Sequence, residues 1–139
     1  MSERAKIHDY AAEQMNHLLT SLAFQIHRAA KLPGPDEIHD VRVAIRRFTQ
    51  GLELFADFYP KRTVKKIERW LTRMIKLTNH IRDRDIGLEY LVKLRKNQLR
   101  RRLVRERLDY QREFGRTVAR WTSRDFSAKW RVGLSLHKV

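Results

Sequence analysis

The sequence contains no cysteine, which excludes disulfide bonds, thiolate chemistry and zinc sites built on cysteine. Residues that break regular structure are also few, with three prolines and five glycines. No apolar run approaches the roughly 20 residues of a membrane-spanning helix. The first residues, MSERAKIHDY, lack the apolar segment of a signal peptide. We therefore expect a soluble cytoplasmic protein, and the scarcity of breakers favours long helices.

Acidic residues are scarce, because 16 Asp and Glu stand against 31 Lys and Arg, a formal net charge of +15 at pH 7. Such an excess in 139 residues indicates a polyanionic partner: nucleic acid, polyphosphate or an anionic membrane surface. The hydrophobic content of 42% argues against general disorder. The length fits a single domain over residues 1–139.

Apolar residues recur at helical spacing along most of the chain, which predicts an all-α fold. Short loops between successive helices favour an elongated antiparallel four-helix bundle with a short irregular C-terminal tail. The expected elements are helices at about 7–31, 36–59, 61–80 and 84–121, and a tail at 123–139.

Capping residues and prolines set the expected helix boundaries. Asp36 is the expected N-cap of the second helix, and Pro60 begins or just precedes the third. Asn and Asp favour turns and caps, so the fourth helix is expected to start near Asp83 or Asp85.

Two patterns compete in the tail. Phe126 and Trp130 are spaced for a short helix, whereas Val132, Leu134 and Leu136 alternate. The tail is expected to dock on the bundle or on a partner chain.

The segment 39–47 of the second helix separates its cations from its apolar residues. At about 100° per residue, His39, Arg42 and Arg46 fall within roughly 60° of one another, opposite the apolar stripe. Like charges placed so closely destabilise a helix slightly. A polyanionic ligand would account for that cost.

The third helix carries a second basic row, opposite its own apolar residues. The row contains no acidic residue, which is unusual for a solvated helix face, and we favour an anion-binding role over a solvated face, with the part of the row from Arg69 to His80 as the other wall of a groove. Its members are Arg62, Lys66, Arg69, Arg73, Lys76 and His80.

Two motifs resemble the CHAD (conserved histidine α-helical domain) family. The run His39-Asp40-Val41-Arg42-Val43-Ala44-Ile45-Arg46-Arg47 resembles the H-x-x-R-V-x-x-R-R signature of that family. Arg82-Asp83-Arg84-Asp85-Ile86 resembles its R-D-x-D-V element. The resemblance covers about residues 5–130, and the order and spacing of the two motifs make it fairly specific.

The resemblance implies binding of inorganic polyphosphate, often at cytoplasmic polyphosphate granules. Guanidinium groups match phosphate oxygens in geometry and stay charged. The expected polyphosphate-binding residues, in a groove between the second and third helices, are His39, Arg42, Arg46, Arg47, Arg69, Arg73, Lys76, His80 and Arg82.

The chain departs from the family in three ways. A typical member has two four-helix halves around a basic groove, and this chain has the length of one half, so a homodimer is one hypothesis. The family often has a further Arg at the position of Thr49. This chain therefore lacks one of the phosphate contacts that the resemblance implies. The family also often has a Gly where Asn79 stands, although Asn can serve the same turn.

Two assignments stay open on sequence alone. Arg47 lies about 80° from His39, so it either contacts phosphate or pairs with Asp83 or Asp85. The arginine-rich stretch from Arg95 to Arg107 is either a solvated face or a secondary binding surface.

Catalysis finds little support in the sequence. There is no glycine-rich phosphate loop, no Ser-His-Asp arrangement and no carboxylate cluster suited to Mg²⁺, and the six histidines are scattered. We therefore expect neither a metal nor a cofactor. The alternatives to a non-catalytic polyphosphate-binding protein are a protein that binds RNA or DNA and an adaptor of granule proteins.

Overall fold

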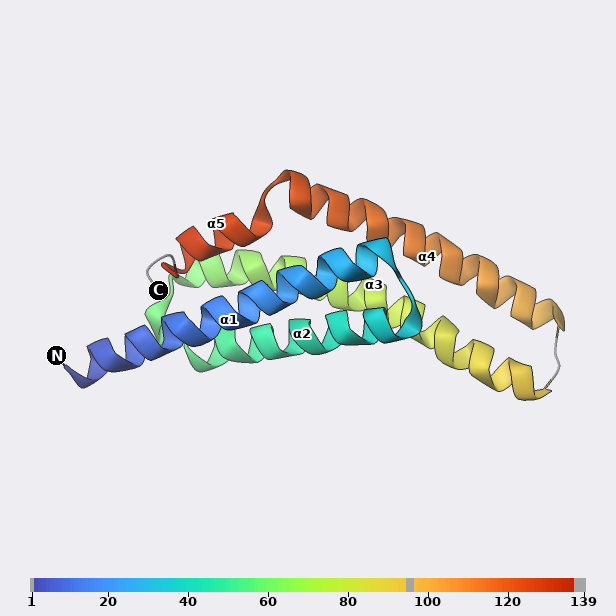
Figure 1. Ribbon diagram of the computed structural model, residues 1–139, viewed down its shortest axis with the longest axis horizontal. Coiled ribbons are helices and arrows are strands. Elements are labelled where there is room, and N and C mark those ends of the chain that lie inside the picture. Colours follow the sequence, from blue (N-terminus) through green and yellow to red (C-terminus); the bar gives the residue numbers. More distant parts are fainter. Residues whose placement is uncertain (1, 95–96, 137–139) are drawn as a thin grey trace.

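The computed structural model describes residues 2–94 and 97–136, and in these ranges the chain forms only helices and their connections (Figure 1). The predicted all-α class is confirmed. The elements are α1 (Glu3–Lys31), α2 (Pro35–Leu54), the 3-10 helix η1 (Ala56–Phe58), α3 (Lys61–Leu94), α4 (Asn97–Ser123) and α5 (Phe126–Gly133).

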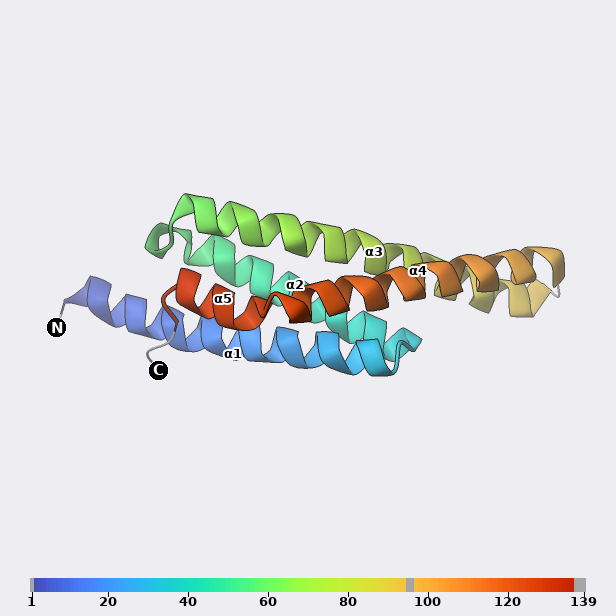
Figure 2. The same ribbon diagram turned by 90° about the horizontal axis from the view of Figure 1, so that it is seen from above.

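Successive long helices run antiparallel, with α2 between α1 and α3, and with α4 against α3 (Figures 1 and 2). The distal parts of α3 and α4 extend past the end of the α1–α2 pair as a hairpin (Figure 1). We call residues 86–94 and 97–106 the arm. The predicted four-helix bundle is not confirmed, because the four long helices do not lie side by side along their whole length.

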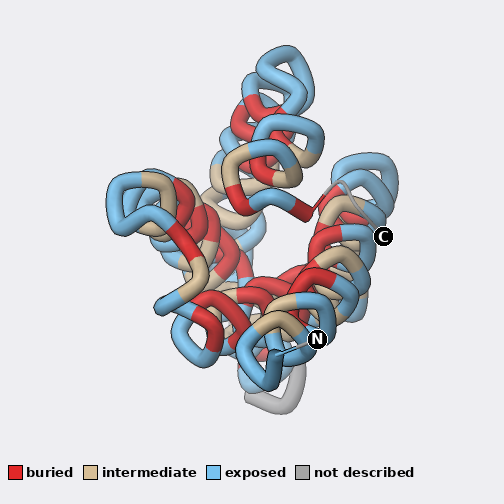
Figure 3. The backbone as a smooth tube through the Cα atoms, turned by 90° about the vertical axis from the view of Figure 1, so that its left-hand side faces the viewer, coloured by how far each residue is buried: buried red, intermediate tan, exposed pale blue. Residues whose placement is uncertain are grey.

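The buried core joins residues from all five α-helices, and none of the arm side chains at 86–91 and 98–106 belongs to it. Figure 3 shows the buried residues on the facing sides of the helices. Phe48 of α2 is fully buried and stacks on Trp130 of α5, with ring centroids 5.8 Å apart. Trp130 also meets Trp70 of α3 and Trp121 of α4 edge to face. These aromatic side chains connect four helices.

The tail docks on the bundle. The predicted short helix is confirmed as α5, and Leu134 and Leu136 beyond it are buried. Asn16 of α1 donates to the carbonyl of Leu136, and Arg131 donates to Asn16 Oδ1 at 3.2 Å. Arg131 also donates to the Thr20 hydroxyl at 2.9 Å. Residues 137–139 of the predicted tail lie outside the described residues.

Several predicted boundaries are wrong. The second helix ends at Leu54 rather than near residue 59, because η1 follows it. Asp36 lies in the first turn of α2, whose N-cap is Gly34, with Pro35 as the first helical residue. Pro60 lies just before α3, which confirms one of the two positions predicted for it, at the start of the third helix or just before that helix.

The largest error concerns the third and fourth helices. They were expected to meet near Asp83, but α3 continues to Leu94 and α4 begins at Asn97. Asp85 caps no helix, because its carboxylate accepts from Arg107 of α4 at 2.9 Å. A tertiary partner thus satisfies a side chain that local reasoning assigns to a cap.

The two helices of the hairpin are joined by close packing and by charged contacts. At Gly87 of α3 a Cβ atom would lie 2.9 Å from Leu103 of α4, so the absence of a side chain permits the approach. Arg107 also donates to the carbonyl of Pro33 at 2.6 Å and thereby connects α4 to the α1–α2 loop.

We expect Arg107→Ala to lower the free energy of unfolding by about 2–4 kcal/mol, because Asp85 would remain as a largely buried charge without its partner. The two side chains are only 14% and 16% exposed. Urea unfolding followed by circular dichroism measures the change. Arg112→Ala, which removes an exposed pair with Asp109, is the control and should change stability little. Equal effects of the two substitutions would contradict this role of Arg107.

Candidate functional site

Four basic side chains from α2 and α3 converge where these helices pack together. His39, Arg42 and Arg46 come from α2, and Arg82 comes from α3. The guanidinium Nη1 of Arg82 lies 3.4 Å from Nδ1 of His39, although the two residues are 43 positions apart in sequence. We call these four residues the α2–α3 cluster.

The positive charge of the α2–α3 cluster is not neutralised. Within the described part of the chain, none of its four residues forms an ion pair with Asp or Glu. Burial lowers the pKa of Arg42, as do the nearby charges of Arg82 and Arg46, whereas Asp83 acts in the opposite direction. Arg42 Nε is buried and has no hydrogen-bond partner among these residues. An anion bound at the cluster would relieve the charge repulsion.

Arg47 lies apart from the α2–α3 cluster. It follows Asp40 by two helical turns, and Asp40 pairs with Arg28 of α1 at 3.2 Å, so Arg47 lies on the α1 side of α2. The alternative pair with Asp85 is wrong, because Asp85 pairs with Arg107. Among the described residues, Arg47 forms no ion pair with Asp83 either.

The basic row of α3 does not form the opposite wall of a single groove with α2. Arg73 and Arg82 are nine residues apart, which at about 100° per residue places them on opposite sides of α3. Arg73, Lys76 and His80 line a cavity between α3 and α4, and Arg69 lies on the outer surface beside Lys65. The expected residues are thus divided by α3: some belong to the α2–α3 cluster, others line the cavity between α3 and α4, and Arg47 and Arg69 belong to neither.

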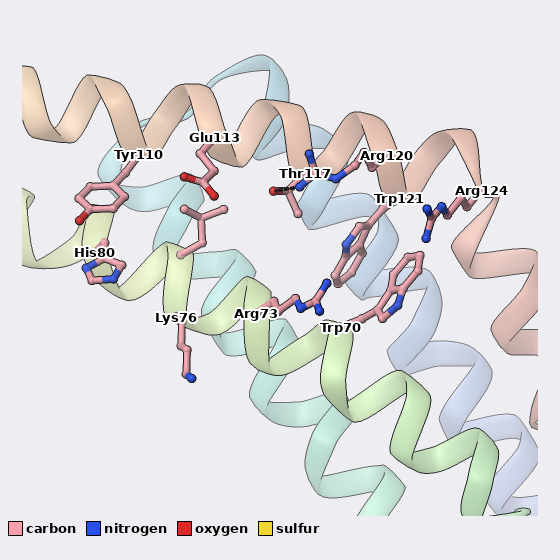
Figure 4. Close-up of a pocket in the computed structure, with 11 residues that line it drawn as sticks. Trp70, Arg73, Lys76, His80, Tyr110, Glu113, Thr117, Arg120, Trp121 and Arg124 are labelled. Carbon is pink, nitrogen blue, oxygen red and sulfur yellow. Dashed lines mark hydrogen bonds between the residues drawn. The ribbon is translucent and has the colours of Figure 1, made fainter.

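The cavity between α3 and α4 has a volume of about 470 Å³ and mixes aromatic and basic side chains (Figure 4). His80 stacks on Tyr110 of α4, with ring centroids 4.5 Å apart. The guanidinium of Arg84 lies 4.8 Å from the same ring. At the other end, Trp70 and Trp121 have centroids 5.2 Å apart.

Sequence reasoning did not assign two arginines of this cavity, Arg120 of α4 and Arg124 just beyond the end of that helix. A signal was present, because Arg112, Arg116, Arg120 and Arg124 recur every four residues and so lie along one side of a helix.

The arginine-rich stretch of α4 divides by structural role. Arg107 is a largely buried structural residue, and Arg102 pairs with Glu106 at 3.3 Å. Arg101 and Arg105 are exposed on the arm around Val104. Arg95 and Lys96 lie outside the described residues.

The two positions that depart from the family pattern have different surroundings. Thr49 lies in a hollow between α2 and α3 beside Arg46, where a longer basic side chain would extend the α2–α3 cluster. Asn79 lies within α3 and serves no turn, so the turn expected there is wrong. Its Oδ1 is buried and has no hydrogen-bond partner among the described residues.

The structure also bears on membrane insertion and on metal binding. No helix in residues 2–94 and 97–136 combines the length and the apolar character needed to cross a bilayer. In the same ranges, no three His, Asp or Glu side chains are grouped so that they could hold a metal ion.

Comparison with protein families gives one match that spans nearly the whole chain. The family model described as CHAD domain matches residues 9–135. Comparison with curated proteins and with solved structures gives no match. The matched range includes both motifs of the resemblance, the α2–α3 cluster and the cavity between α3 and α4.

Proposed function

Because the chain belongs to the CHAD domain family, we propose that it binds inorganic polyphosphate, without catalysis, through the α2–α3 cluster. The convergence of His39, Arg42, Arg46 and Arg82 without acidic partners is the observation that supports this proposal. CHAD domains are associated with polyphosphate binding in general.

The chemistry of the α2–α3 cluster suits a flexible chain of phosphates. Arginine presents a planar set of donors that fits phosphate oxygens, and it stays charged at neutral pH. Arg42 is half-buried, whereas Arg46 and Arg82 are exposed and accessible to a ligand. Arg69 on the outer surface of α3 would extend the track, as would Lys76, whose ammonium points away from α4 at the edge of the cavity (Figure 4), and Arg47 is a peripheral candidate.

Competition binding tests the proposal. Labelled polyphosphate is displaced by unlabelled polyphosphate, RNA or DNA of equal total charge, at several salt concentrations. We expect polyphosphate to be the strongest competitor, and binding to weaken steadily as salt rises because counterions are released. Equal displacement by RNA would contradict specificity for polyphosphate and favour the nucleic-acid alternative.

The aromatic residues argue against single-stranded nucleic acid as the main ligand. Such ligands usually stack on exposed aromatic rings beside the basic track. Tyr110 is instead covered by His80 and Arg84, and Trp70 packs against Trp121 and Trp130.

The adaptor alternative relied on a free tail. Residues 126–136 pack on the bundle instead, which leaves that alternative with less support.

For the polyphosphate-binding protein, we propose a cytoplasmic location at polyphosphate granules. A fluorescent fusion that stays diffuse in granule-containing cells would contradict it.

We also propose that two copies pair to restore the length of a typical CHAD domain. The arm offers exposed apolar side chains for such a contact, among them Tyr90 of α3 and Leu99 and Val104 of α4. Light scattering at high protein concentration should then give the mass of a dimer. A monomeric mass under these conditions would contradict pairing without affecting the polyphosphate proposal.

A further inference from the structure

The cavity between α3 and α4 differs in chemistry from the α2–α3 cluster. We propose that it is a second binding site, for a small ligand that joins a phosphate group to an aromatic ring, as a nucleotide does. The proposal goes beyond polyphosphate binding, because it concerns other residues and another class of ligand.

One end of the cavity is suited to phosphate. Arg73 of α3, Arg120 near the end of α4 and Arg124 just beyond that helix line this end (Figure 4). Within residues 2–94 and 97–136, none of the three forms an ion pair with a carboxylate. Arg120 donates to the Thr117 hydroxyl at 3.1 Å, which orients it and leaves its charge without a counter-ion. Three such guanidinium groups around one space attract an anion.

Aromatic rings line both ends of the cavity. Trp70 and Trp121 lie between the guanidinium groups of Arg73 and Arg124 in Figure 4, and the Tyr110–His80 stack lies at the opposite end. The cavity volume of about 470 Å³ falls in the range of small-molecule sites, which usually combine apolar walls with a few polar groups. Neighbouring groups already pack on the faces of Tyr110 and Trp70, so these rings offer their edges, against which a flat ligand ring packs better than a bare chain of phosphates.

Glu113 distinguishes this cavity from the α2–α3 cluster. Its exposed carboxylate lies in the cavity wall between the two aromatic ends, and it forms no ion pair among the described residues. A carboxylate repels a ligand that is anionic along its whole length. It accepts hydrogen bonds from amino or hydroxyl groups, which the base and sugar of a nucleotide carry. The cavity therefore favours a ligand with one anionic end.

The two sites are separated by α3, so each can fail without the other. Arg73 points to the α4 side of that helix and Arg82 to the α2 side. The double substitution of Arg42 and Arg46 should therefore leave nucleotide affinity unchanged. Loss of nucleotide binding in that variant would place the nucleotide at the α2–α3 cluster and overturn the second site, while leaving the polyphosphate proposal intact.

Calorimetric titration of the full-length R42A/R46A variant with ATP and with inorganic tripolyphosphate, at near-physiological salt, tests the proposal, because the α2–α3 cluster then contributes little to the binding of either ligand. Both ligands carry three linked phosphates, and only ATP carries a base and sugar. We expect ATP to bind at least about tenfold more tightly, because its base and sugar add edge-to-face ring contacts and hydrogen bonds to the cavity walls. Equal affinities, or no binding of ATP at millimolar concentration, would overturn the proposal.

Matched variants locate the binding. R73Q/R120Q should weaken ATP binding at least about tenfold, because two phosphate contacts are lost. R69Q/R116Q removes the same charge one turn earlier on the same helices, outside the cavity, and should change the affinity less than about twofold. Equal losses would overturn the site. All four side chains are exposed, and the single variant R124Q provides a second test if R73Q/R120Q loses helix content.

Discussion

Replacing both Arg42 and Arg46 with alanine should weaken polyphosphate binding by about 100-fold while the helix content stays unchanged. Two charge-assisted hydrogen bonds at about 1.5 kcal/mol each account for that factor. The salt dependence of log K should become shallower by about 1.4, at about 0.7 per lost phosphate contact for a flexible polyanion. Alanine favours helix, so α2 should persist. Fluorescence anisotropy with labelled polyphosphate at several salt concentrations measures both quantities.

The matched control is R101A/R105A. It also removes two arginines four residues apart on one helix, but both are exposed and lie on the arm. If only the net charge matters, both variants should lose the same polyphosphate affinity. If polyphosphate binds at the α2–α3 cluster, the control should lose much less affinity. Equal losses would overturn the site assignment and would indicate that the arm is a binding surface of equal weight.

Phe48→Ala should lower the free energy of unfolding by about 3–5 kcal/mol, the usual cost of removing a fully buried aromatic side chain. Phe48 is 0% exposed and stacks on Trp130, so its loss leaves a cavity between α2 and α5. Urea unfolding measures the change, and tryptophan fluorescence should report looser packing around Trp130.

Phe24→Ala is the control for this substitution. Phe24 of α1 is 61% exposed, so the same change in chemistry should have little effect on stability. If the two variants unfold at similar urea concentrations, burial of Phe48 against Trp130 does not contribute the expected free energy of unfolding.

Sequence patterns alone were sufficient to predict the helical class and the basic side of α2. Helical periodicity is a local property, so His39, Arg42 and Arg46 could be placed together on one side of α2 from residue spacing. The two motifs around these residues and Arg82 were also sufficient for the family, which the match over residues 9–135 confirms.

Local signals failed wherever a distant residue changed the outcome. Asp85 resembles a helix cap, but a partner 22 residues away satisfies it, and α3 therefore continues to Leu94. Arg107 looks like part of a basic stretch, but it is a structural link to the Pro33 carbonyl. No spacing rule predicts such pairs, since they depend on which helices are adjacent.

The basic row of α3 shows the same limit at the functional level. The spacing of the row predicts that its side chains lie opposite the apolar residues of α3, and the structure confirms this for Arg69, Arg73, Lys76 and His80, which are exposed. The spacing does not predict which neighbouring helix each side chain faces. Only the packing of α2 and α4 on different sides of α3 determined that Arg82 joins the α2–α3 cluster while Arg73 lines a cavity with Arg120. The sequence by itself determined which side chains share a helix face, because that follows from backbone geometry. The tertiary structure alone decided which faces meet, because that depends on contacts between distant segments.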